Sequence, residues 1–250
     1  MKQLAELIRQ NPGFDVNEKD DSGWALLHHA CNGPFSFSVI PLLLAHPEIN
    51  VNLKDESGRT PFYVACCGRT SSARLLLQDS RVKVNESNRI GYTSLYWAAH
   101  FGSLDIVMWW IASEREMDLE KPGDEKTDAI GVARNESMIE VVTLLERFKA
   151  NPEKTRHEVR LEVGWYDEAA AEMFALVVFV SDGLLKAKDA TITPPAARFF
   201  NIARNLPLEL QMVLCFRHVG SAKEIIQGKD SEAAFKELAK RFLWSSFFTG

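Results

Sequence analysis

The residues with the clearest chemical potential lie in two short stretches of the chain. His28, His29 and Cys31 could together hold a metal ion, because imidazole nitrogens and thiolates are ligands that zinc prefers. Cys66 and Cys67 could supply a reactive thiol, which needs a lowered pKa and access to solvent. Neither stretch belongs to a CxxC pair or an HExxH motif. We therefore expect no metal site and no catalytic cysteine.

Paired carboxylates are the other group that could support catalysis. Glu168 and Glu172 share one face of an expected helix at four-residue spacing, an arrangement common among solvated side chains. The chain contains no GxxxxGK[ST] phosphate loop, no GxSxG nucleophile turn and no GxGxxG dinucleotide motif. The sequence therefore predicts no catalytic residues, no cofactor and no enzymatic activity. An enzyme whose site lies unrecognised in residues 165–250 is an alternative.

The composition is that of an ordinary globular protein, with 46% hydrophobic and 25% charged residues and a formal net charge of −5. Without an excess of basic residues, we expect no nucleic-acid partner. The apolar run at 173–180 is too short to cross a membrane, and the start MKQLAELIRQ lacks the apolar core of a signal peptide. The four cysteines form no CxxC pair. We expect reduced thiols in a cytoplasmic or nuclear protein that has no membrane partner.

The elements that must position these residues are repeated along the first part of the chain. Three stretches align with one another: DDSGWALLHHAC (20–31), DESGRTPFYVAC (55–66) and NRIGYTSLYWAA (88–99). Equivalent positions are 35 and then 33 residues apart, as in Gly23, Gly58 and Gly91 and in the preceding Asn17, Asn52 and Asn85. Such a period predicts stacked units, because one unit alone cannot bury its apolar face.

Each unit contains residues that favour a turn, a short helix, a loop and a longer helix. The glycine tolerates positive φ in a tight turn, and Thr60 and Thr93 can cap the first helix through their hydroxyl groups. Alanines keep the first helix thin: Ala30, Ala65, Ala98 and Ala99. Apolar runs at 39–46, 73–80 and 106–113 predict the second helix.

These residues resemble the ankyrin-repeat pattern, whose core is close to D-x-x-G-x-T-P-L-H-x-A-A-x-x-G. The second unit departs from it at Phe62 and Tyr63, which replace Leu and His, and the third has Ser94 in place of Pro. A degenerate fourth repeat covers 117–148, and residues 1–17 resemble half of a capping repeat. The resemblance implies an all-α solenoid of about four repeats over residues 1–150, in which the histidine equivalent to His28 hydrogen-bonds the turn backbone.

The resemblance also implies non-catalytic protein–protein recognition through a concave face made by the turn tips and the first helices. The variable positions with side chains suited to an interface are Trp24, Arg59, Arg89, Tyr92, His100 and Phe101. Trp97 is ambiguous, since its helix position could instead pack between repeats. The alternative is that these aromatic side chains only pack against neighbouring parts of the chain. Asn52 and Asn85 match a position that the family's asparagine hydroxylase can modify, but we expect them to hold the turn.

The last hundred residues do not continue the repeat. Asn151 and Pro152 favour a break, so we expect a linker or connecting helix at 151–164 and a helical domain at 165–250. Helices are predicted at 165–180, 196–206, 206–220, 221–226 and 230–244. Residues 205–244 resemble an F-box, a family pattern of three helices, at Leu206, Pro207, Glu209, Leu210, Val213 and Leu214. This implies an alternative function, a substrate receptor that binds the adaptor subunit of a cullin-type ubiquitin ligase.

Overall fold

The structure is a computed structural model that describes residues 14–33, 36–121, 127–181, 199, 202–203 and 205–249. The chain divides into two compact units, one made of Met1–Val159 with Phe248–Gly250 and the other of Arg160–Phe247. The described residues form twelve helices and no strand, so the all-α class is confirmed.

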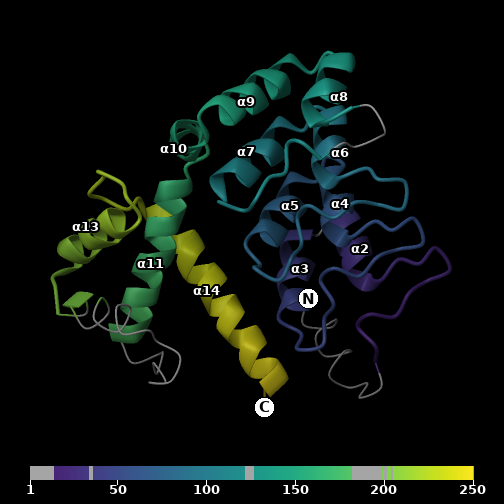
Figure 1. Ribbon diagram of the computed structural model, residues 1–250. Helices are drawn as coiled ribbons and strands as arrows, with labels where there is room; N and C mark the ends of the chain where they lie inside the picture. The colour runs from purple at the N-terminus through teal and green to yellow at the C-terminus, as the bar shows by residue number, and fades with distance from the viewer. Residues whose placement is uncertain are drawn as a thin grey trace. The chain divides into compact units, whose positions relative to one another are not determined.

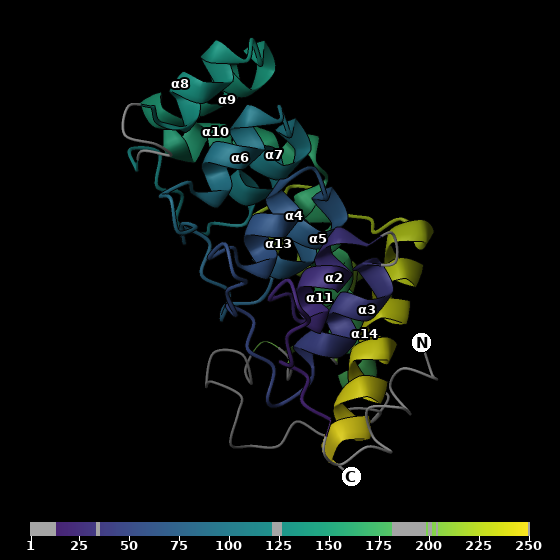
Figure 2. The same cartoon turned by 90° about the vertical axis from the view of Figure 1, so that its right-hand side faces the viewer.

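The helices of the first unit come in pairs that follow one another along the chain. Their bounds are α2 Leu26–Asn32, α3 Ser36–Leu44, α4 Pro61–Cys66, α5 Thr70–Leu77, α6 Ser94–His100, α7 Leu104–Ala112, α8 Ala129–Asn135 and α9 Ile139–Ala150. The first helices α2, α4, α6 and α8 lie side by side in one layer, and α3, α5, α7 and α9 form a second layer (Figures 1 and 2). This is the solenoid that the ankyrin resemblance implies.

Small and large side chains alternate where the layers meet. Ala65 and Ala98 of the first helices are fully buried, so neighbouring helices approach closely. Phe62 of α4 is also fully buried, and its ring meets the edge of Trp110 of α7 with the ring centroids 5.0 Å apart. Burying a side chain of this size stabilises the fold by about 1.5–3 kcal/mol. The stack is therefore held by contacts that run from each repeat to the next.

We call the turns before α2, α4 and α6 the first, second and third fingers, which are residues 20–24, 55–59 and 88–92. Each begins with a side-chain acceptor that receives the backbone N–H groups two and four residues later. In the second finger, Asp55 Oδ1 accepts from Ser57 and Arg59 at 2.9 and 2.8 Å, and Asp20 and Asn88 do the same in the other fingers. The turn glycines have φ of +74°, +78° and +95°.

Hydrogen bonds confirm the expected threonine caps, whereas the asparagines expected to hold the turn bond the next repeat instead. Thr60 Oγ1 accepts from the backbone N–H of Tyr63 at 3.2 Å, and Thr93 caps α6 in the same way. Asn52 holds the following repeat, because its Nδ2 donates to the Arg81 carbonyl at 2.8 Å and its Oδ1 accepts from the Lys83 backbone at 2.7 Å. Asn17 and Asn85 make the equivalent pairs of bonds. These asparagines bind each repeat to the next.

The observed elements differ from the expected ones in detail. The second helices begin two or three residues before the apolar runs, since polar residues occupy their first turns. In the fourth repeat, where the sequence offers no matching threonine cap, α8 is capped by Asp128, whose carboxylate accepts from the Gly131 N–H at 2.7 Å. Residues 1–13, which make up most of the segment resembling half of a capping repeat, lie outside the described residues.

The second unit contains three long helices around its own core. The helix α10 Pro152–Glu162 precedes α11 Trp165–Ser181, α13 Leu208–His218 and α14 Gly228–Thr249. Phe174 of α11, Phe216 of α13 and Ala234 of α14 are buried in one apolar cluster. Most of the predicted helix at 196–206 lies outside the described residues.

The short helix predicted at 221–226 is wrong. Gly220, with φ +82°, ends α13, and residues 221–227 have no regular structure although Ile226 is buried. Six residues are too few to stabilise a helix without strong packing, and Ile225 points into solvent. Residues 205–244 therefore contain two described helices, where the F-box pattern has three.

Candidate functional site

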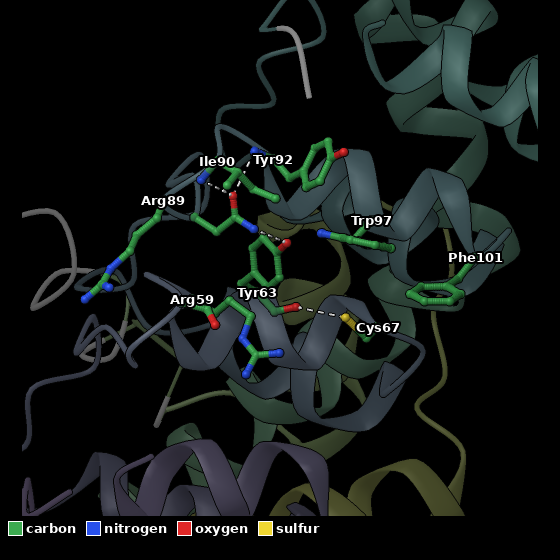
Figure 3. A pocket seen from close by; sticks show the side chains of 10 residues that line it. Arg59, Tyr63, Cys67, Arg89, Ile90, Tyr92, Trp97 and Phe101 are labelled. Atoms are coloured by element: carbon green, nitrogen blue, oxygen red, sulfur yellow. Dashed lines mark hydrogen bonds between the residues drawn. The ribbon is translucent and has the colours of Figure 1, made fainter. Parts of the chain in front are cut away.

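A pocket of about 500 Å³ opens between the second and third fingers, on the side of the stack that carries the fingers and the first helices (Figure 3). Both fingers and both first helices contribute to it. The lining residues are Ser57, Arg59, Tyr63, Cys67, Asn88, Arg89, Ile90, Tyr92, Trp97 and Phe101. It is the junction of two repeats, and not one repeat alone, that builds this site.

The walls of the pocket are aromatic rings held at fixed angles to one another. Trp97 of α6 is the central ring, since Tyr92 meets it edge-on at 5.6 Å and Tyr63 at 6.4 Å between ring centroids. Phe101, one helical turn later, stacks on Trp97 at 5.3 Å. Asn88 Nδ2 donates to the Tyr63 hydroxyl at 2.9 Å and so ties the third finger to α4. Burial raises the pKa of Tyr63, so its phenol stays protonated and can act as a hydrogen-bond donor.

One rim of the pocket is formed by Arg59, whose position is set by a buried carboxylate. Asp55 is 4% exposed, and its Oδ2 accepts from Arg59 Nε at 2.7 Å and from Trp24 Nε1 at 3.1 Å. The Arg59 guanidinium also lies 5.6 Å from the centre of the Trp24 ring, within the range of a cation–π contact. These contacts join the first finger to the second and orient Arg59.

The other rim is the tip of the third finger. Arg89 and Ile90 are both exposed there, and 71% of Ile90 is accessible to solvent. The Arg89 backbone N–H donates to the Ser57 carbonyl at 2.9 Å, which holds the two fingers together. An apolar side chain at such exposure is suited to contact with another molecule.

The structure brings together four of the six residues predicted to bind a partner. Arg59, Arg89, Tyr92 and Phe101 line the pocket, and Phe101 is 52% exposed. Trp24 does not line it, because its indole is bonded to Asp55. His100 does not line it either: its ring meets Trp97 edge-on and stacks on Tyr96, and its Nδ1 lies 3.4 Å from a Glu136 carboxylate oxygen.

Sequence reasoning missed Tyr63 and Asn88 as pocket residues and left Trp97 undecided. Tyr63 was counted only as a departure from the family's histidine, although a tyrosine reaches further into the groove than a histidine does. Asn88 stands where the other two fingers have aspartate. Both substitutions were signals that could have drawn attention to this junction.

The residues first considered for metal or thiol chemistry have separate partners. His28 Nδ1 accepts from the Ala25 N–H at 3.2 Å and Nε2 donates to the Arg59 carbonyl at 3.1 Å, so the ring bridges two fingers as the resemblance implies. His29 Nε2 instead lies 2.8 Å from the carboxylate oxygen Oδ2 of Asp20. Among the described residues, no three His, Cys, Asp or Glu side chains gather as a possible metal site. Cys67 is exposed in the pocket, whereas the other three cysteines are buried.

The residues of the F-box resemblance lie at the start of α13. Pro207 and Leu210 are exposed, while Leu206, Val213 and Leu214 are half-buried. Leu214 packs against the core of the second unit. Adaptor binding by these residues stays a prediction.

Comparison with known proteins agrees with the family resemblance for the first part of the chain. The sequence model described as ankyrin repeats (3 copies) matches residues 1–88. A search of curated proteins finds no match.

Beyond residue 88, the helix pairs α6/α7 and α8/α9 continue the same stack. In the described part of the chain, no helix is both long enough and apolar enough to span a membrane. Ankyrin repeats are protein–protein interaction modules and are generally not catalytic. The family prediction is confirmed: this chain carries ankyrin repeats over residues 1–88, in a helical stack that extends to residue 150.

Proposed function

We propose that the protein recognises a partner protein through the concave face formed by its fingers and first helices. The aromatic pocket between the second and third fingers is the anchor of this surface. The observation that carries the proposal is the gathering of Arg59, Arg89, Tyr92 and Phe101, from two fingers and a helix, around one pocket. Arginine and aromatic side chains around a concave site are the residues that most often dominate binding energy.

Photo-cross-linking with the intact chain tests this proposal. A photoreactive benzoylphenylalanine replaces Phe101 in one variant and Ile139 in a control variant. Ile139 is 75% exposed at the start of α9, outside the concave face. We expect a protein that cross-links from position 101 and not from position 139.

A binding measurement with the captured protein completes the test. Ile90→Asp and Phe101→Asp each replace an exposed apolar side chain with a charged one. Each variant should therefore bind the captured protein about tenfold or more weakly, without a large change in melting temperature. Tyr92 is less suitable for this purpose, because it stacks on Tyr96 at 4.7 Å and contributes to packing. Identical cross-linked proteins from both positions, or full binding by both aspartate variants, would refute recognition through this face.

Adaptor binding by residues 205–244 is the second candidate. Its support is the exposed apolar pair Leu208 and Leu210 on α13, with 54% and 50% of these side chains accessible. Co-purification of a cullin adaptor that is lost in Leu210→Asp and kept in Phe101→Asp would favour this function. Co-purification of no adaptor with the intact chain would refute it.

A further inference from the structure

The pocket contains a buried hydrogen-bond donor that the chain itself does not satisfy. Trp97 Nε1 is covered by protein, yet it donates no hydrogen bond to any of the described residues. In Figure 3 the nitrogen-bearing edge of this indole points toward Tyr63 and the interior of the pocket. Buried indole N–H groups usually have a partner, so an unsatisfied one beside a pocket points to an acceptor on a ligand.

The charge of the pocket lining is opposite to that of the whole chain. Arg59 and Arg89 are both part of the lining, which contains no aspartate or glutamate, whereas the formal net charge of the protein is −5. Arg89 is exposed and forms no ion pair with any described residue. The carboxylate of Asp55 already holds Arg59 from behind, which fixes the guanidinium in place at the rim. A ligand with negative charge complements this lining, and a cationic ligand does not.

Two apolar side chains of the pocket lining are well exposed to solvent. Ile90 at the finger tip and Phe101 at the end of α6 are the most exposed of its apolar side chains. A bound molecule that covers both must extend along the third repeat, from its finger tip to the end of α6, as a peptide segment does. The aromatic walls then offer a place for one apolar side chain of that segment.

We propose that the occupant is an extended acidic segment of the partner protein. An aromatic or aliphatic side chain of the segment packs against Tyr92, Trp97 and Phe101. An aspartate or glutamate next to it binds between Arg59 and Arg89, and a further acceptor of the segment receives the N–H of Trp97. The last contact requires a side chain that covers this atom to turn, and such rotamer changes are common when interfaces form. The inference rests on the function proposed above and specifies the chemistry of the partner.

A display library of random peptides, selected on the intact chain, identifies the preferred segment. We expect the selected peptides to place aspartate or glutamate within two positions of an aromatic or aliphatic residue. Bound peptide should also protect Cys67 from alkylation by iodoacetamide, because this thiol lies in the pocket. Selection of neutral or basic peptides, or of none, would overturn the acidic segment as occupant.

Fluorescence anisotropy with the best synthetic peptide, in its acidic form and with its acid replaced by the matching amide, then locates the contacts. Arg89→Glu should raise the Kd of the acidic peptide about tenfold, equivalent to roughly 1.4 kcal/mol, and should affect the amide peptide much less. The matched control is Lys83→Glu, a charge reversal at an exposed lysine outside the pocket lining, which should change neither Kd.

The indole contact has its own pair of variants. Trp97→Phe keeps an aromatic ring and removes the N–H, and we expect binding to weaken severalfold. Trp109→Phe is the control, since Trp109 lies in the second layer on α7, with the Arg74 guanidinium 4.0 Å from its ring centre. If Arg89→Glu and Trp97→Phe bind normally while Ile90→Asp does not, the acidic segment is refuted as the occupant, whereas recognition of a partner through the concave face is supported. If all three bind normally, both proposals fail.

Discussion

The fit between neighbouring fingers can be measured with one substitution, Gly58→Ala. Gly58 has φ +78°, and a Cβ built on it would lie 2.8 Å from the backbone nitrogen of Arg89 in the next finger. Gly91 occupies the equivalent turn of the third finger with φ +95°, but nothing lies within 4 Å of its Cβ position. The two alanine variants therefore share the backbone strain and differ in the contact.

The expected magnitudes follow from these contacts. An alanine at positive φ costs about 1–2 kcal/mol, and this cost applies to both variants. The loss of glycine's freedom in the unfolded chain offsets a part that is also common to both. Only Gly58→Ala must push Arg89 away, which breaks the hydrogen bond from its N–H to the Ser57 carbonyl and costs about 0.5–1.5 kcal/mol more. Gly58→Ala should thus be the less stable variant by about that amount.

Urea denaturation of the two variants and the wild type gives the free energies of unfolding, with unchanged m-values as the sign of a common unfolding reaction. Because Arg89 and Ile90 move with the third finger, Gly58→Ala should also weaken partner binding more than Gly91→Ala does. Equal losses of stability in the two variants would show that the fingers adjust to each other freely, and would refute the idea that their spacing is fixed.

Three further predictions concern the groups around the fingers. Burial lowers the pKa of His28 below its ordinary 6.5, so the neutral imidazole contributes its full stability above this pH. The free energy of unfolding then falls as the pH drops, with a slope of at most about 1.4 kcal/mol per pH unit. Urea midpoints measured at several pH values should depend less steeply on pH in His28→Gln than in the exposed control His157→Gln. The side chain of Cys67 is exposed, but the surrounding protein partly desolvates its thiol and raises its pKa, so its rate of alkylation by iodoacetamide, followed by mass spectrometry, should keep rising beyond pH 9, and a plateau below pH 8 would contradict this. Asp55→Asn keeps an acceptor for the finger backbone but places an amide N–H against the Arg59 guanidinium, which should cost about 1.5–3 kcal/mol in urea denaturation; wild-type stability would show that the carboxylate charge is not needed.

The first part of the fold could be predicted because each repeat is specified by local residues. Turn glycines, threonine caps and alanines recur at one period, and Thr60 and Thr93 cap their helices as expected. The second unit has no such redundancy. Its buried residues, such as Phe174 and Phe216, come from helices far apart in sequence, so no local pattern shows which of them meet. The wrong helix at 221–226 is a result of the same limit.

The sequence could predict which positions line the candidate site, but not which contacts their side chains make. The variable positions of the family pattern identified Arg59, Arg89, Tyr92 and Phe101. They could not show that Trp24 is bonded to Asp55, because a hydrogen bond across 31 residues depends on how two fingers approach each other. The unsatisfied indole N–H of Trp97 is a property of the packed structure, and no sequence signal marks it.

The pocket lies at one junction because two residues there depart from the repeat pattern. At the first junction, His28 bonds directly to the carbonyl of Arg59, and the two fingers are tied closely together. At the second junction the equivalent residue is Tyr63, whose longer side chain reaches Asn88 through its hydroxyl. At this position a tyrosine forms an aromatic wall of the pocket, whereas a histidine forms a hydrogen bond to the backbone of the next finger. An asparagine in place of aspartate leaves the finger turn intact, because its Oδ1 still accepts both N–H groups, yet it removes a negative charge from the lining. The same two substitutions thus build the walls of the pocket and keep carboxylates out of its lining, so that Arg89 is left without a carboxylate partner among the described residues while Arg59 is held by Asp55. This is why we propose the second junction, and not the first, as the place for an acidic partner.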